Sequence, residues 1–423
     1  AGTSSAQQRP QNVGGDPAAD TLRITRRQAI ATALRANPQV DVAREQTAQV
    51  RAQRVEGNMI PDFVLSASLD SITRFRDIGS APSRPVGVGI TVPFPDKFRL
   101  HNTIGNENVR SSQAQLLLME QQIAAEAGRV YDSVLVTRLH RRDFTDARQL
   151  AADFLQRTQA RFNAGSVARL DVINAQVSLA SADNDLIGNA RDVTNAEAAL
   201  NRILGRALGL PVIAVDSLGV PDPLPDLAAI EQSALRVRPE IASADANLRA
   251  AEANTKLTKE LAFTPDINAS AARDYGDPAW NSNTTYSLGI SIPLPVLFWQ
   301  HTKGDFAETH HRELELQATL RDTKAGVAQD VRTSFATADA ARRQVVFIRD
   351  QLLPSAREAY RVATSSYALG GLSALDVLTA RTALLTAESQ YADALAAANS
   401  ARSDLERAAG APLSTLPPGA SRE

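Results

Sequence analysis

The 423-residue sequence predicts a mainly helical protein with a small β part, built from a duplicated unit of helix, strand, strand, long helix and helix. Three observations predict this fold class: the chain repeats itself at a constant spacing, long helix-forming stretches contain no proline, and four short segments alternate apolar with small or polar residues. The composition agrees with a folded chain, since 43% of the residues are hydrophobic and the net charge is only −2.

The repeat is clearest around two glycine-containing turns. Residues 161–172 and 366–377 match without a gap at a spacing of 205 positions, and the similarity continues through the helical patterns behind them. Upstream, residues 86–95 and 286–295 match at a spacing of 200 positions. A period of about 200 residues indicates a duplicated domain rather than a solenoid, whose repeats are ~20–50 residues long.

The duplication divides the chain into five parts. We expect a flexible lead-in at 1–20, a first repeat at 21–213, a linker at 214–226, a second repeat at 227–413 and a flexible tail at 414–423.

Each repeat contains two predicted strands, at about 62–71 and 85–93 in the first and at about 266–275 and 284–293 in the second. Each strand has one apolar face, and a loop rich in glycine and proline separates the two strands of each pair. Four strands are too few to close a barrel around an aqueous lumen. Twelve strands pooled by three chains, each of ~8–10 residues, would be long enough to cross a bilayer at a tilt.

The remaining sequence has a helical pattern. The segment 98–163 lacks proline, and ~65 residues at a rise of 1.5 Å would span roughly 100 Å. Its equivalent in the second repeat is 302–369, in which Pro354 could cause a kink. The shorter predicted helices are 38–59, 169–204, 239–262 and 374–408.

The composition excludes several classes of function. The chain has no cysteine, which rules out a thiol nucleophile, a cysteine-ligated metal centre and a disulfide framework. The near-neutral charge without a basic block argues against a nucleic-acid partner. Gly87 and Gly89 lie inside a predicted strand and lack the following helix of a dinucleotide site, and no catalytic motif occurs, so we expect neither enzymatic activity nor a cofactor.

The paired motifs resemble the TolC-type outer membrane factors. The resemblance covers about residues 22–413 and rests on the duplication and on four motifs: Leu-Arg-Ala-Asn-Pro at 34–38, Pro-Asp at 61–62, Pro-x-Pro at 93–95 and aromatic-x-x-Gly-x-x-x-x-Leu-Asp-Val at 162–172. It implies a homotrimer that forms a 12-stranded outer-membrane β-barrel continued by a 12-helix periplasmic tunnel. The implied function is the exit duct of a tripartite efflux system. Its partners would be a periplasmic adaptor (membrane fusion) protein, an inner-membrane pump and outer-membrane lipid.

The resemblance also implies that the two glycine turns form a periplasmic tip that docks on the adaptor. Glycine accepts the positive φ that such turns need. The candidate docking residues are Phe162, Gly165 and Val167 in the first repeat and Tyr367, Gly370 and Gly371 in the second. A plain connection between two helices is the alternative role for these turns.

Asp171 and Asp376 match the family's aspartates that ring the constricted tunnel entrance, six per trimer. Like charges gathered in a narrow lumen favour cations over anions. The alternative is a capping role, because both residues lie about one turn into a helix, near its positive end. The sequence departs from the family at Leu372, where some members carry an arginine that holds the gate closed. It also departs at Asn174 and Thr379, where the family has a second acidic residue. We therefore expect apolar contacts around Leu372 and Tyr367, rather than the same salt bridges, to contribute to closure.

His101 and His301 occupy equivalent positions just beyond the strands, so a trimer could gather six imidazoles at one height. Such a ring, together with the compact length, would suit a heavy-metal branch of the family. Solvated polar side chains are the more common explanation, and we expect no metal site. Two other functions remain open: a duct for type I protein secretion and, from a different class, a helical scaffold that forms no channel.

Overall fold

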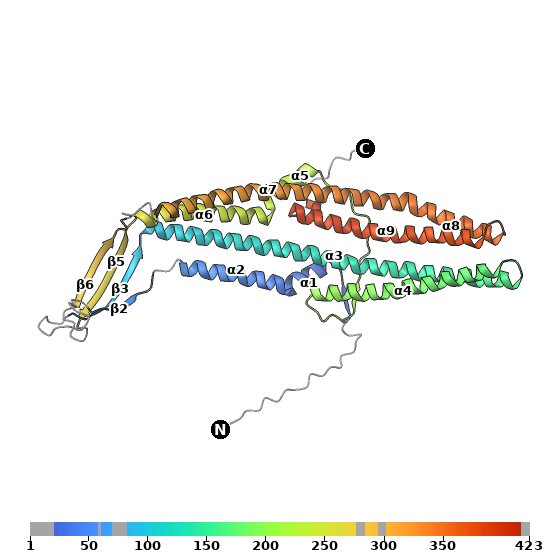
Figure 1. The fold of residues 1–423 in the computed structure, drawn as a ribbon, viewed down its shortest axis with the longest axis horizontal. Helices are drawn as coiled ribbons and strands as arrows, with labels where there is room; N and C mark the ends of the chain where they lie inside the picture. Colours follow the sequence, from blue (N-terminus) through green and yellow to red (C-terminus); the bar gives the residue numbers. More distant parts are fainter. Residues whose placement is uncertain (1–20, 58–60, 70–82, 276–283, 295–301, 416–423) are drawn as a thin grey trace, which may run out of the picture. The chain divides into compact units, whose positions relative to one another are not determined.

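The computed structural model describes residues 21–57, 61–69, 83–275, 284–294 and 302–415 (Figure 1). The described chain is mainly helical with a small β part, as the sequence predicts. None of the helices in these ranges combines the length and the apolar character needed to cross a membrane. The lead-in expected at 1–20 and most of the tail expected at 414–423 fall outside the described residues.

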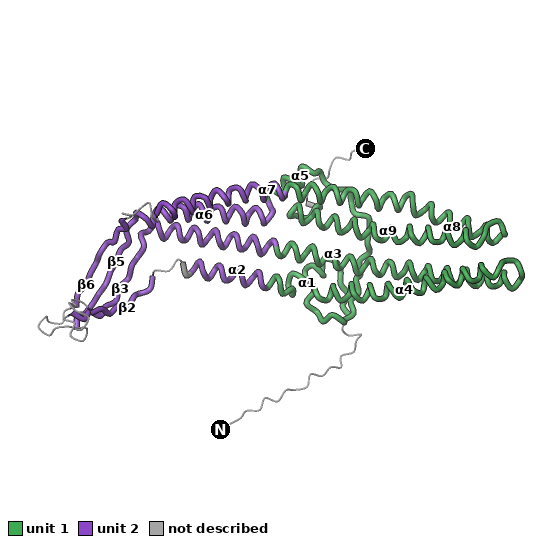
Figure 2. The backbone as a smooth tube through the Cα atoms, viewed as in Figure 1, with its two compact units in different colours: residues 1–41, 119–236, 328–423 green, residues 42–118, 237–327 purple. Residues whose placement is uncertain are grey.

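Contacts divide the chain into two compact units, each with residues from both repeats (Figure 2). One unit comprises residues 1–41, 119–236 and 328–423, and the other comprises residues 42–118 and 237–327. The first holds the two glycine turns, and the second holds the larger sheet. The boundaries of the sequence repeats stay a prediction, because the compact units group residues in a different way.

The larger sheet has four antiparallel strands in the order β2-β3-β5-β6. Their bounds are Val64–Ala67 (β2), Pro85–Pro93 (β3), Asp266–Asp274 (β5) and Thr284–Ser291 (β6). Strand β2 is shorter than the expected 62–71, of which residues 70 and 71 lie outside the described part. The two hairpins join through β3 and β5, whose register runs from Pro85↔Asp274 to Pro93↔Asp266. One continuous sheet is therefore built from both repeats.

The long helices largely follow the sequence prediction. Helix α3 covers Pro95–Asn163, 69 residues without a break, and returns as α4, Arg169–Ile203. The predicted helix at 302–369 consists of α7 (Thr302–Phe347), the π-helical turn η2 (Ile348–Leu352) and α8 (Leu353–Ala368), and it returns as α9 (Ala374–Ala409). The remaining helices are α1 (Arg26–Ala36), α2 (Pro38–Gly57), α5 (Leu227–Val237) and α6 (Pro239–Phe263).

The π-helical turn stands where the sequence suggests a kink. Pro354 lies two residues beyond the end of this turn and has no N–H to continue the regular hydrogen-bond ladder, so the preceding turn widens. Ile348, inside the turn, packs in a buried cluster with Val345 and Leu395. The helical path thus continues past the proline.

A second, two-stranded sheet was not predicted. Strand β1 (Leu22–Ile24) pairs in parallel with β4 (Val212–Ala214), which overlaps the start of the linker expected at 214–226. The buried Tyr131 hydroxyl donates to the Ile24 carbonyl at 2.9 Å and lies 2.9 Å from an Asp216 carboxylate oxygen. Burial raises the pKa of Tyr131 to about 12. Strands of three residues are too short to show an alternating pattern in the sequence.

Candidate functional site

The turn from α3 to α4 and the turn from α8 to α9 have the same backbone geometry. Gly165 and Gly370 have φ of 71° and 83°. The Gly165 and Ser166 amides donate to Phe162 and Arg161, both at 2.9 Å, and the Gly370 and Gly371 amides donate to the equivalent carbonyls at 3.0 and 2.9 Å. This is the Schellman arrangement, in which a residue of positive φ satisfies the last carbonyls of a helix.

The two returning helices begin differently. Ser373 caps α9: its hydroxyl accepts from the Asp376 amide at 3.3 Å, and the Asp376 carboxylate accepts from the Ser373 amide at 3.0 Å and the hydroxyl at 2.7 Å. These hydrogen bonds lower the pKa of Asp376. At the start of α4, the Asp171 carboxylate accepts from the Ala168 amide at 3.3 Å, and alanine has no side-chain oxygen to return the bond. The α4 cap is thus half complete.

We expect Ala168→Ser to complete this cap and raise the free energy of unfolding by ~1 kcal/mol, because a serine oxygen would accept from the Asp171 amide. Thermal unfolding of the purified protein measures the effect. The matched variant Ser373→Ala should lower stability by a similar amount, whereas an unchanged melting temperature in both variants would contradict the capping role.

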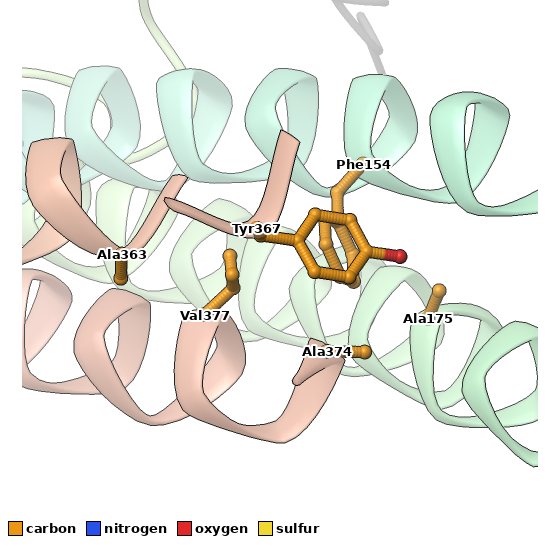
Figure 3. Close-up of a cluster of buried hydrophobic side chains, with 6 residues drawn as sticks. All are labelled: Phe154, Ala175, Ala363, Tyr367, Ala374 and Val377. Atoms are coloured by element: carbon orange, nitrogen blue, oxygen red, sulfur yellow. The ribbon is translucent and has the colours of Figure 1, made fainter. Parts of the chain in front are cut away.

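A buried cluster lies behind the turns (Figure 3). Tyr367 is only 7% exposed and packs against Phe154 with ring centroids 5.6 Å apart. The Arg161 guanidinium lies 4.4 Å from the centre of the Tyr367 ring and also donates to the Tyr367 carbonyl at 2.7 Å. Tyr367 therefore packs inside the protomer and is not available for docking in this structure. Phe154 and Arg161 contribute to this site without having been singled out from the sequence.

The other candidate docking residues are more accessible. Phe162 is 36% exposed, Val167 is half-buried, and all three glycines are exposed. The gate candidate Leu372, which follows Gly371 in the second turn, is 39% exposed. A Cβ at Gly165 or Gly370 would meet no atom within 4 Å. Beside the turns, a pocket of about 490 Å³ lies between α3 and α8, and its lining includes Phe154, Arg157, Arg161, Tyr360 and Tyr367.

The two candidate gate aspartates lie on the first turns of α4 and α9. Asp376 is exposed and Asp171 half-buried, and neither forms an ion pair within the described ranges. Both cap their own helix, so the structure accommodates the capping alternative and leaves the gate role as a prediction. Asn174 lines a pocket of about 450 Å³ between α4 and α9, and the exposed Thr379 hydroxyl donates to the Leu375 carbonyl at 2.9 Å.

The histidine pair is only partly described. His101 is exposed on α3, and His301 lies outside the described residues. In the part of the chain that the structure describes, no group of three or more histidines and carboxylates is placed to hold a metal ion.

A charged cluster joins α3 and α9. His140 Nε2 lies 2.9 Å from an Asp393 carboxylate oxygen, and Glu388 pairs with Arg357 at 3.6 Å. Burial, followed by the negative charge of Glu388, raises the pKa of Asp143 to about 6. The folded protein therefore holds a proton on Asp143 more tightly than the unfolded chain does.

Because the pKa of Asp143 is raised on folding, its contribution to stability should increase as the pH falls from about 7 towards 4. We expect Asp143→Asn to stabilise the protein at pH 7.5 by ~1 kcal/mol, a value reduced for its partial exposure, and to have little effect at pH 4.5. Denaturant unfolding at the two pH values measures this difference. An equal effect at both pH values would show that Asp143 titrates normally.

The fold is that of outer-membrane channel proteins. A membrane protein from Pseudomonas aeruginosa matches with a TM-score of 0.79 at 19% identity, covering 96% of this chain and 99% of that one. CusC, described as forming a transmembrane channel, matches with a TM-score of 0.77 at 17% identity and the same coverage.

The chain belongs to the outer membrane efflux protein family, whose model matches residues 27–206 and 230–411. Among curated proteins, it is 25% identical over 301 residues to the cobalt-zinc-cadmium resistance protein CzcC of Cupriavidus metallidurans. The aligned residues cover 71% of this chain and 70% of CzcC. The protein is thus a bacterial outer-membrane efflux channel of tripartite systems with a periplasmic helical extension, and neither an enzyme nor a scaffold without a channel.

Proposed function

We propose that three copies of this chain form the exit duct through which small molecules or ions leave the periplasm. The edges of the four-stranded sheet carry this proposal. Strands β2 and β6 each have one neighbour in the described sheet, and every residue of both strands is exposed. Pairing β6 of one protomer with β2 of the next would give twelve strands and leave no free edge.

The side chains of β6 support a wall that faces lipid. Tyr286, Leu288 and Ile290 alternate along the strand, so they share one face, and all three are strongly exposed in the single chain. An apolar outer face is typical of transmembrane β-barrels.

The partners that we propose are a periplasmic adaptor protein and an inner-membrane pump. The two glycine turns, with Phe162, Val167 and Leu372, would contact the adaptor, and the pocket between α3 and α8 offers a concave surface beside them. Tyr367 would act indirectly, by supporting the turn from beneath. Asp171 and Asp376 would favour cations at the entrance.

The proposal is tested with detergent-extracted protein. We expect a trimer by light scattering and ion conductance in planar bilayers. A monomer without conductance would overturn the proposal. The relative CzcC is named for resistance to metal ions, so metal sensitivity of a deletion strain is the first substrate test, and secretion of an unfolded protein substrate would instead indicate the type I alternative.

A further inference from the structure

Arg381 is a buried cation that links three helices. It lies on α9, five residues after Asp376, and is only 4% exposed. Its Nη1 donates to the Ser178 hydroxyl of α4, and its Nη2 donates to the Ala147 carbonyl of α3 at 2.7 Å. One guanidinium therefore fixes α9 against both helices of the other hairpin.

The surroundings of Arg381 do not neutralise its charge. No carboxylate lies within ion-pair distance of it among the described residues, and its Nε is buried without a hydrogen-bond partner. Burial lowers the pKa of the guanidinium, with weaker opposing effects from Tyr360 and Asp185. A buried charge held only by neutral acceptors is costly, and an apolar side chain would often pack there at least as stably. Stability alone does not explain an arginine here, whereas a fixed helix position does.

The Arg381–Ser178 pair is not repeated at the equivalent positions of the first repeat. The positions that correspond to Arg381 and Ser178 at the 205-residue spacing are Gln176 and Ala383, and both are exposed. The arginine link between the two hairpins thus starts from α9, and the equivalent position of α4 carries no cation. Such asymmetry inside a duplicated chain indicates a role specific to α9.

A pocket lies beside the Arg381 link, so the position of α9 against α4 depends on the hydrogen bonds of Arg381. The pocket of about 450 Å³ between α4 and α9 is lined by Arg381, Ser178, Asn174 and Leu375. The pocket shows that α4 and α9 are not tightly packed against each other here. If the hydrogen bonds of the Arg381 guanidinium break, α9 can therefore shift against α4.

We propose that Arg381 is a positioning residue of the channel entrance, which holds the start of α9, and with it Asp376, in its resting place. The proposal rests on the entrance function proposed above for the turns. Breaking the link should let the entrance widen, and strengthening the link should keep it narrow.

Three variants test this proposal. Arg381→Met removes the donors and keeps the length of the side chain, Ser178→Asp gives the guanidinium a carboxylate partner, and Gln176→Met is the exposed control at the equivalent position. We expect Arg381→Met to raise single-channel conductance at least about twofold, because the entrance would be wider. Ser178→Asp should lower conductance below that of the parent, and Gln176→Met should leave it unchanged.

The opposite directions separate positioning from simple damage, because misfolding cannot raise conductance in one variant and lower it in the other. If Arg381→Met does not assemble, the conductance of Ser178→Asp alone tests the proposal. A Ser178→Asp conductance at or above the parental value then overturns it. Unchanged conductance in both variants, with a conducting parent, removes Arg381 from the gate and leaves the duct intact. A parent that does not conduct refutes the duct and the positioning role together.

Discussion

Replacing Gly87 with alanine is expected to prevent most of the protein from assembling in the outer membrane. Gly87 lies on β3 opposite Ala272 of β5, in the ladder that joins the two repeats. A Cβ at this position would lie 2.6 Å from the Ala272 Cβ and 2.8 Å from the Ala271 carbonyl oxygen, so the backbone of β5 must move. Overpacking of this kind costs ~1–3 kcal/mol, and a trimer would bear that cost three times.

Gly89 provides the matched control for this prediction. It lies two residues further along β3, where a Cβ would lie 3.4 Å from the Ser270 Cβ, an ordinary contact. Gly89→Ala should therefore assemble like the parent. The measurement is the fraction of heat-resistant trimer in outer-membrane preparations, and equal trimer yields for the two variants would contradict the tight β3–β5 contact.

Replacing Asp171 and Asp376 together with asparagine is expected to lower cation selectivity several-fold in single-channel recordings. A trimer would lose six carboxylates, which the proposed duct gathers at its narrow entrance, while the asparagine amide oxygens retain much of the capping role at α4 and α9. The reversal potential in a salt gradient measures the change.

Two further variants separate charge from capping. Ser373→Ala weakens the α9 cap and keeps the Asp376 charge, so selectivity should not change. Asn174→Asp with Thr379→Asp adds a carboxylate one turn further along each helix, and in the asparagine background it should restore selectivity. Unchanged selectivity in the double asparagine variant would remove both aspartates from the gate and leave capping as their role.

Repeat-level features of this protein follow from its sequence. Matched motifs spaced 205 and 200 positions apart reveal the duplication, and the absence of proline from 98 to 163 predicts the long α3. The glycines at 165 and 370 predict the two turns, because only a residue that tolerates positive φ closes a helix in this way. All these signals are local, or they compare the chain with itself.

Other parts of the candidate site could not be predicted from local pattern. Tyr367 has the spacing of a docking residue, and only the cluster with Phe154 and Arg161 shows that it is buried. Arg381 carries no signal in the sequence, since its repeat equivalent is Gln176 and its partners on α3 and α4 are more than 200 positions away. The short strand β1 likewise could not be predicted, because it forms only by pairing with the distant β4.

The sequence by itself thus determined the duplicated helical plan, the two turns and the family resemblance, because helix periodicity, glycine φ and internal repetition are properties of neighbouring or equivalent residues. Only the tertiary structure decided that β3 pairs with β5 to join the repeats, that Tyr367 is buried and that Arg381 links three helices. These contacts depend on where distant segments meet in the fold, and they leave no periodic pattern of residues in the sequence.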